Sequence, residues 1–141
     1  MIRKLIPLDL DTVLNIWLDA SVIAHDFIPK EFWQDKVQDM RTIYIPSSES
    51  FVLEHQNKVV GFVSLVENQI AAIFVDPTQQ GQGFGKKLLD YTKSLRSHLE
   101  LSVYAKNSKS IEFYKRQSFK IQKEEIEPEA QEPCYVMTWS Q

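Results

Sequence analysis

The chain has 141 residues, of which 43% are hydrophobic and 25% charged, a composition typical of one globular domain spanning residues 1–141 rather than of a disordered protein. The formal net charge of −3, from 16 basic and 19 acidic residues, argues against a nucleic-acid partner, which favours a basic surface. Because no stretch approaches the roughly 18 consecutive apolar residues of a membrane span, and the N-terminus lacks an apolar leader, we expect a cytoplasmic protein without a membrane partner.

The first half of the chain is expected to form a strand, two helices and three further strands. Residues 2–6 have the pattern of a short strand, and Asp9 is placed to cap a helix that runs to about Ile23. Pro29 suits the first turn of a second helix, which ends before Pro46. The three strands that follow are predicted at residues 51–54, 58–66 and 70–75.

The second half alternates helices and strands. A glycine-rich loop leads into a helix that ends near Leu95, and residues 99–105 then alternate between apolar and polar side chains, as a strand does. Asn107 is placed to cap another helix, and two closing strands are expected at about 119–126 and 134–139. The predicted order is βααβββαβαββ, which indicates an α/β domain built on a mixed sheet.

Cysteine and histidine usage gives no support for a disulfide or a metal site. Cys134 is the only cysteine and lies in an apolar run, so we expect a small buried side chain rather than a nucleophile. The three histidines, His25, His55 and His98, are far apart and lack ligand spacing, so no metal is predicted.

The glycine-rich loop is the strongest sign of chemistry in the sequence. Gly81, Gly83 and Gly85 follow an apolar strand and open a helix, so several backbone N–H groups can converge on one anion. The spacing differs from the dinucleotide fingerprint, and Lys86 is not followed by Ser or Thr as in a nucleoside-triphosphate loop. The loop alone fits either a phosphate or pyrophosphate site or a flexible strand-to-helix turn.

Two motifs carry a resemblance to a known family. Gln80-x-x-Gly83-x-Gly85, which follows Val75, resembles the acyl-CoA signature of the GNAT superfamily of N-acetyltransferases. The second motif is similar to that superfamily's Asn-x-x-Ala-x-x-Phe-Tyr-x-x-x-Gly-Phe stretch and consists of Asn107, Ser110, Phe113, Tyr114 and Phe119. The resemblance covers essentially the whole chain and implies a mixed, largely antiparallel sheet flanked by helices. The stretch from Trp17 to Ile28 further resembles small bacterial members that include protein-lysine acetyltransferases.

The resemblance implies that the protein transfers an acetyl group from acetyl-CoA to a primary amine, such as a protein lysine or another cationic amine, by direct attack on the thioester. Asn107 would hydrogen-bond the pantetheine arm, and Tyr114 would protonate the departing thiolate. Taken singly, Asn107 is read as a helix cap and Tyr114 as a core residue; their arrival after the glycine loop favours the functional roles. The implied CoA-binding residues are Ile73, Phe74, Val75, Gln80, Gly81, Gln82, Gly83, Phe84, Gly85, Lys86, Asn107 and Tyr114. A monomer or a homodimer is expected.

The general base is the least determined part of the site. Some members of the superfamily have a glutamate where Ser102 stands here, so His25 and Glu67 become the candidates for that role. His25 has an ordinary pKa near neutrality and lies in a loop that borders the acceptor site in this fold, where its alternative reading is a surface or helix-end histidine. Aromatic residues that would line the acceptor pocket, or belong to the core, are Phe27, Trp33, Tyr104 and Tyr135.

Two other functions remain open from the sequence, and so does the role of an acidic connection near the C-terminus. Without an evident base, the chain could be an acyl-CoA-binding regulatory module without turnover, and the glycine loop alone would also suit a nucleotide-binding protein. The connection between the closing strands either attracts a cationic acceptor or is an ordinary solvated loop. Its acidic residues are Glu124, Glu125, Glu127, Glu129 and Glu132.

Overall fold

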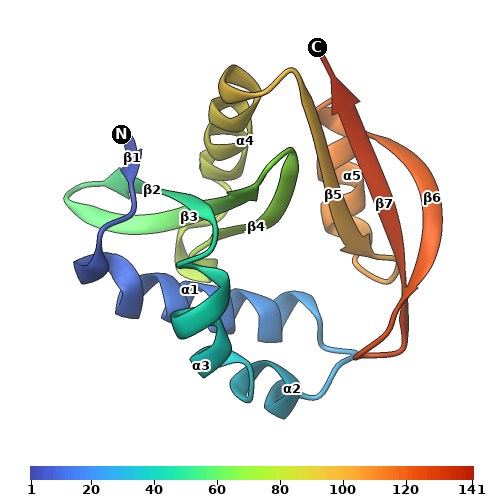
Figure 1. Cartoon of the computed structure of the whole chain (residues 1–141), viewed down its shortest axis with the longest axis horizontal. Helices are drawn as coiled ribbons and strands as arrows, with labels where there is room; N and C mark the ends of the chain where they lie inside the picture. The colour runs from blue at the N-terminus through green and yellow to red at the C-terminus, as the bar shows by residue number, and fades with distance from the viewer.

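One seven-stranded sheet organises the computed structural model, which describes residues 1–141 (Figure 1). The strand order is β1-β2-β3-β4-β5-β7-β6, and every neighbouring pair is antiparallel except β4 and β5, which are parallel. The predicted mixed, largely antiparallel sheet is therefore confirmed. The strands are β1 (Ile2–Lys4), β2 (Glu49–His55), β3 (Lys58–Val66), β4 (Gln69–Val75), β5 (His98–Tyr104), β6 (Lys120–Glu127) and β7 (Glu132–Ser140).

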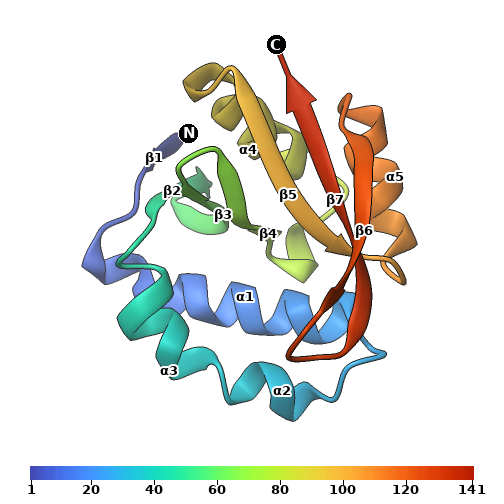
Figure 2. The ribbon, with the colours of Figure 1, turned by 45° about the vertical axis from the view of Figure 1, so that its right-hand side comes forward.

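Helices cover both faces of the sheet (Figure 2). The longer ones are α1 (Leu10–Ala24), α4 (Phe84–Leu95) and α5 (Ser108–Arg116); α2 (Lys30–Gln34) and α3 (Val37–Asp39) are short. Successive strand residues face opposite sides, so Phe51 and Leu53 pack with α4 and α5, whereas Val52 packs with α1 and α2. Two apolar layers result, which explains why the central strands are almost wholly apolar. None of the helices is long and apolar enough to cross a membrane.

Two local expectations in the first third of the chain are wrong. The helix predicted from Pro29 to before Pro46 is instead α2, α3 and a π-helical turn at Met40–Tyr44. Only Trp33 and Ile45 of this segment are buried, so it lacks the continuous apolar stripe that sustains a long helix. Asp9 does not cap α1 through its side chain, because its carboxylate accepts hydrogen bonds from the Arg3 guanidinium and the Ile6 backbone N–H.

The parallel strands β4 and β5 diverge, and this divergence positions the site. They pair only at Gln69 and Glu100, next to a 2.9 Å hydrogen bond from the Glu100 N–H to the Asn68 carbonyl. Towards its C-terminal end β4 remains paired with β3 alone, up to Gly61 opposite Val75. One edge of β4 is consequently left without a neighbouring strand.

Candidate functional site

A cavity of about 960 Å³ lies where β4 and β5 diverge. Its walls come from the C-terminal end of α1, from α2, from β4 and β5, from the glycine loop and from α5. Segments from the first, middle and last thirds of the chain therefore meet at one place.

The wall formed by β4 exposes backbone groups to this cavity. The Asp76 N–H donates to the Val60 carbonyl at 2.7 Å, on the β3 side. Because backbone groups alternate in direction along a strand, Val75 and Ile73 turn theirs to the opposite side. Gln80 Nε2, at 3.4 Å from the Val75 carbonyl oxygen, lies on that side too. The β4 edge can thus accept and donate hydrogen bonds as an unpaired strand does.

The glycine loop lies at the same end of β4 and has the geometry of an anion cradle. Gly81 and Gly83 have φ angles of +83° and +81°, a left-handed conformation that glycine adopts without strain. A β-carbon at either position would meet nothing within 4 Å, so the backbone is open to a close-fitting group. Gly83 is also the N-cap of α4, whose first N–H groups have no partner within the helix. These features fit a phosphate or pyrophosphate group.

Side chains of the loop contribute unequally. Phe84 is buried in the core, and the Lys86 ammonium pairs with Asp90 at 2.7 Å. The Gln82 amide donates to Gln79, and Gln82 is the one implied CoA-binding residue that does not line the cavity. The backbone therefore dominates this part of the site.

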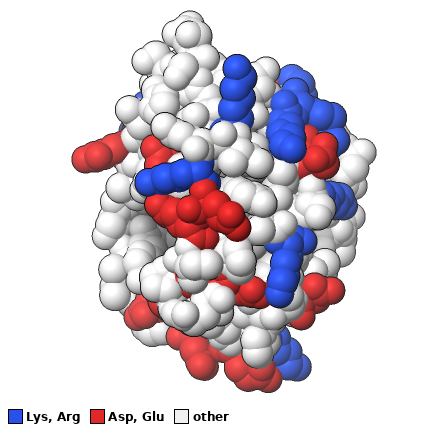
Figure 3. Space-filling model, turned by 90° about the vertical axis from the view of Figure 1, so that its right-hand side faces the viewer, with Lys and Arg blue, Asp and Glu red and all other residues white.

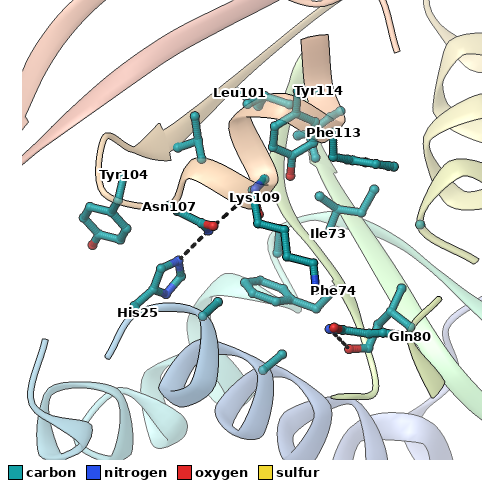
Figure 4. A pocket seen from close by; sticks show the side chains of 18 of the residues that line it. His25, Ile73, Phe74, Gln80, Leu101, Tyr104, Asn107, Lys109, Phe113 and Tyr114 are labelled. Atoms are coloured by element: carbon teal, nitrogen blue, oxygen red, sulfur yellow. Dashed lines mark hydrogen bonds between the residues drawn. The ribbon is translucent and has the colours of Figure 1, made fainter. Parts of the chain in front are cut away.

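Helix α5 brings Asn107 and Tyr114 to the opposite wall (Figure 4). Asn107 caps α5 as predicted, since its Oδ1 accepts the Ser110 N–H at 3.3 Å. The half-buried Tyr114 ring packs against Phe113 and Phe119, and its hydroxyl makes no hydrogen bond within the chain. Burial raises the pKa of Tyr114 to about 12, so the hydroxyl keeps its proton at neutral pH and can donate it.

His25 also reaches the cavity, but in a different state from the one predicted. The residue is only 8% exposed, and its imidazole is surrounded by the rings of Phe27, Trp33 and Tyr104. Burial lowers the pKa of His25 to about 4, and the backbone of Ser21 opposes only part of this shift. The expectation of an ordinary pKa near 6.5 is therefore wrong, and the ring is neutral at physiological pH.

The remaining candidates are divided between the cavity and other places. Ser102 and Tyr104 line the cavity, as does Trp33, whereas Phe27 contributes to the enclosure of His25 from outside the lining. Glu67 occupies the β3–β4 turn, where its carbonyl accepts from Arg96, and it does not line the cavity. Tyr135 packs against the core and is likewise outside the lining.

The sequence interpretation missed two cations on α5. Lys109 and Arg116 both line the cavity, and neither forms an ion pair. Figure 4 shows the Lys109 side chain extending from α5 towards Phe74 on β4. The sequence could have indicated them, because Lys109, Phe113 and Arg116 follow the spacing of one helical face and Phe113 belongs to the family motif.

Several carboxylates of the acidic connection already form hydrogen bonds or ion pairs within the chain. The Glu127 carboxylate accepts the backbone N–H groups of Glu129 and Ala130, at 3.1 and 2.6 Å. Glu129 pairs with Lys36, and Glu132 with Lys106. Figure 3 shows the face of the molecule that lies on the right in Figure 1; acidic side chains gather near its centre, with basic side chains beside them. These pairs reduce the field that would attract a cationic acceptor.

No group of three or more His, Cys, Asp or Glu side chains is arranged to hold a metal.

Comparisons with known proteins agree with this geometry. The chain is 36% identical over 140 residues to the peptidyl-lysine N-acetyltransferase YiaC of Escherichia coli (strain K12), covering 99% of this chain and 96% of that protein. It is 28% identical to the peptidyl-lysine N-acetyltransferase YjaB of Salmonella typhimurium, over 79% of this chain and 77% of that protein. The solution structure of apo YjaB from Escherichia coli superposes with a TM-score of 0.86 at 23% identity, covering 99% and 96% of the two chains.

The family comparison covers the centre of the site. A sequence model described as the acetyltransferase (GNAT) domain matches residues 46–121, which include β4, the glycine loop, β5 and all of α5. This chain therefore belongs to the GNAT family of N-acetyltransferases, and its reaction is the transfer of an acetyl group from acetyl-CoA to an amine.

Proposed function

We propose that the acceptor is the ε-amine of a lysine in a protein or peptide and that residues 1–141 act as one acetyltransferase domain. The observation that carries acetyl transfer by this one domain is a cavity joining an anion cradle, an unpaired strand edge and a protonated tyrosine hydroxyl. The peptidyl-lysine activity named for YiaC and YjaB supports the choice of lysine. All of these groups come from a single chain, so a monomer or a homodimer would each hold complete sites.

Acetyl-CoA would lie along β4. Backbone N–H groups from Gly81 to Lys86 are suited to its pyrophosphate, and the free edge at Ile73 and Val75 is suited to pairing with the pantetheine arm. The Val75 N–H would polarise the thioester carbonyl, as an oxyanion donor does. Asn107 would hydrogen-bond the arm from the opposite wall.

The chemistry is a direct acyl transfer. The thioester supplies an activated carbonyl carbon, the neutral amine nitrogen forms the new C–N bond, and the C–S bond breaks. Tyr114 donates its phenolic proton to the sulfur that leaves, and the proton lost by the amine passes to water. Because the pKa of Tyr114 lies well above neutral pH, its hydroxyl is protonated when the sulfur develops negative charge.

The reaction also requires that the acceptor amine lose a proton before it attacks. A lysine with a pKa of about 10.4 lies roughly three units from its neutral form at pH 7.5, a free-energy difference of about 4 kcal/mol. His25 is buried with a pKa of about 4, which makes it a weak base at pH 7.5, and Ser102 stands where a glutamate could. Ordered water, together with desolvation of the amine beside Trp33 and Tyr104, would supply the help.

The proposal is tested by combining the purified chain with acetyl-CoA and two peptides that differ only in whether their single amine is a lysine ε-amine or an α-amine. Free thiol release and peptide mass are followed together. We expect acetylation of the lysine peptide, strongly reduced in Tyr114→Phe. Acetyl-CoA binding without thiol release on any amine would favour a regulatory module, and transfer to the α-amine alone would contradict the lysine assignment.

A further inference from the structure

We propose that His25 is a positioning residue that holds the Asn107 amide for the cofactor arm, and that it is not the general base. The inference rests on the proposed function to the extent that Asn107 contacts acetyl-CoA. His25 ends α1 and Asn107 begins α5, 82 residues later, so the contact joins the acceptor-side and cofactor-side walls of the cavity (Figure 4).

The orientation of the Asn107 amide is fixed by the helix that it caps. Its side-chain atom near the Ser110 N–H, at 3.3 Å, must be the oxygen, because only an oxygen can accept that bond. The amide nitrogen then faces His25 Nε2 at 3.4 Å. One N–H of Asn107 points at the imidazole, and the second makes no hydrogen bond within the chain, which leaves it for a carbonyl of the pantetheine arm.

This orientation also fixes the tautomer of His25. Since the Asn107 nitrogen is a donor, Nε2 must accept, and the ring proton lies on Nδ1. The imidazole is held in place by Trp33 and Tyr104, with ring centroids at 5.1 and 4.9 Å. Nδ1 is buried without a hydrogen-bond partner of good geometry, so the Asn107 contact is the one well-defined polar contact of the side chain.

The same geometry argues against a role in proton transfer. A proton taken up at Nε2 would bring two donors face to face, and Asn107 could recover only by turning its amide and giving up the Ser110 cap. No charged side chain contributes to the pKa shift of His25, and the Ser21 backbone offsets only part of the desolvation that disfavours an imidazolium. His25 therefore acts through Asn107, as a neutral acceptor.

The tautomer can be measured without any variant. Long-range ¹⁵N–¹H NMR of the wild-type chain at pH 7 should show a protonated Nδ1 and an unprotonated Nε2 for His25. The opposite tautomer, or an imidazolium at that pH, would overturn the inference.

The functional test uses His25→Phe, which keeps an aromatic ring but removes the acceptor, and His25→Gln, whose amide oxygen can replace Nε2. His25→Phe should weaken acetyl-CoA binding about fivefold, the usual value of one neutral hydrogen bond, with kcat and its pH profile close to wild type. His25→Gln should recover part of the affinity. In an Asn107→Ala background, His25→Phe should cause no further loss of affinity, because the group it positions is gone.

Three outcomes of this functional test would overturn the inference. The first is a lost limb in the kcat pH profile with unchanged acetyl-CoA affinity, which would make His25 the base. The second is full additivity of the two substitutions, and the third is undiminished affinity in a folded His25→Phe. If the wild-type chain itself fails to bind acetyl-CoA in calorimetry, the proposed function fails first and the inference falls with it; the wild-type measurement separates the two cases.

Discussion

The buried, neutral His25 should make the stability of the fold depend on pH in a defined window. Its pKa is lowered to about 4 in the folded chain, against an ordinary value of about 6.5. Below pH 6.5 His25 is protonated in the unfolded chain but stays neutral in the folded chain, so the free energy of unfolding falls as pH drops from about 6.5 towards 4. Between pH 7.5 and pH 5 this linkage is worth about 2 kcal/mol, from the two pKa values and 1.36 kcal/mol per unit.

The substitution His25→Phe removes this linkage without opening a large void. Urea unfolding of both proteins at pH 7.5 and pH 5 gives the free energy of unfolding, and the loss between the two pH values should be about 2 kcal/mol smaller in the variant. His55→Gln removes a histidine outside the aromatic enclosure and should retain the step that His25 produces. Equal losses in wild type and His25→Phe, within about 0.5 kcal/mol, would refute the buried neutral state of His25.

Three further predictions concern the cofactor and the leaving group. Gly83→Val should fold with some loss of stability, because valine strains a φ of +81°, and should lose acetyl-CoA binding in calorimetry; undiminished affinity in a folded variant would remove the loop from the site. Tyr114→Phe should lower turnover by roughly a hundredfold with little change in acetyl-CoA affinity, whereas a rate near wild type would mean that water protonates the thiolate. Lys109→Gln should weaken acetyl-CoA binding about two- to fivefold, the range of one exposed charge contact, and leave acetyl-pantetheine, which has no phosphates, unaffected. Lys115→Gln, on the same helix but outside the cavity lining, is the matched control, and equal losses for both ligands would show that Lys109 does not meet a phosphate.

The elements that the sequence predicted correctly are those governed by short-range rules. Alternation identified the buried face of β5 at Leu99, Leu101 and Val103, and capping chemistry identified Asn107. Each of these features is decided within about one turn or one strand of the chain.

The features that the sequence could not predict depend on distant partners. Asp9 is a residue type that often caps helices, but in the fold its carboxylate accepts hydrogen bonds from Arg3 of β1 and from the Ile6 N–H instead. The pKa of His25 is lowered by burial, which is complete only when Tyr104 of β5 packs against the imidazole beside Phe27 and Trp33, and pattern analysis cannot measure such burial. Glu67 looked available as a base because the sequence does not show which end of β4 faces the cavity.

Acetyl transfer to lysine is tested most directly by mass spectrometry of a peptide with one lysine and a blocked N-terminus, incubated with the purified chain and acetyl-CoA. We expect the peptide to gain the mass of one acetyl group on the lysine side chain, with one equivalent of free CoA released and with strongly reduced yield in Tyr114→Phe. An unmodified peptide, from a wild-type chain that binds acetyl-CoA in the same sample and across a panel of lysine sequence contexts, would contradict the assignment of lysine as the acceptor.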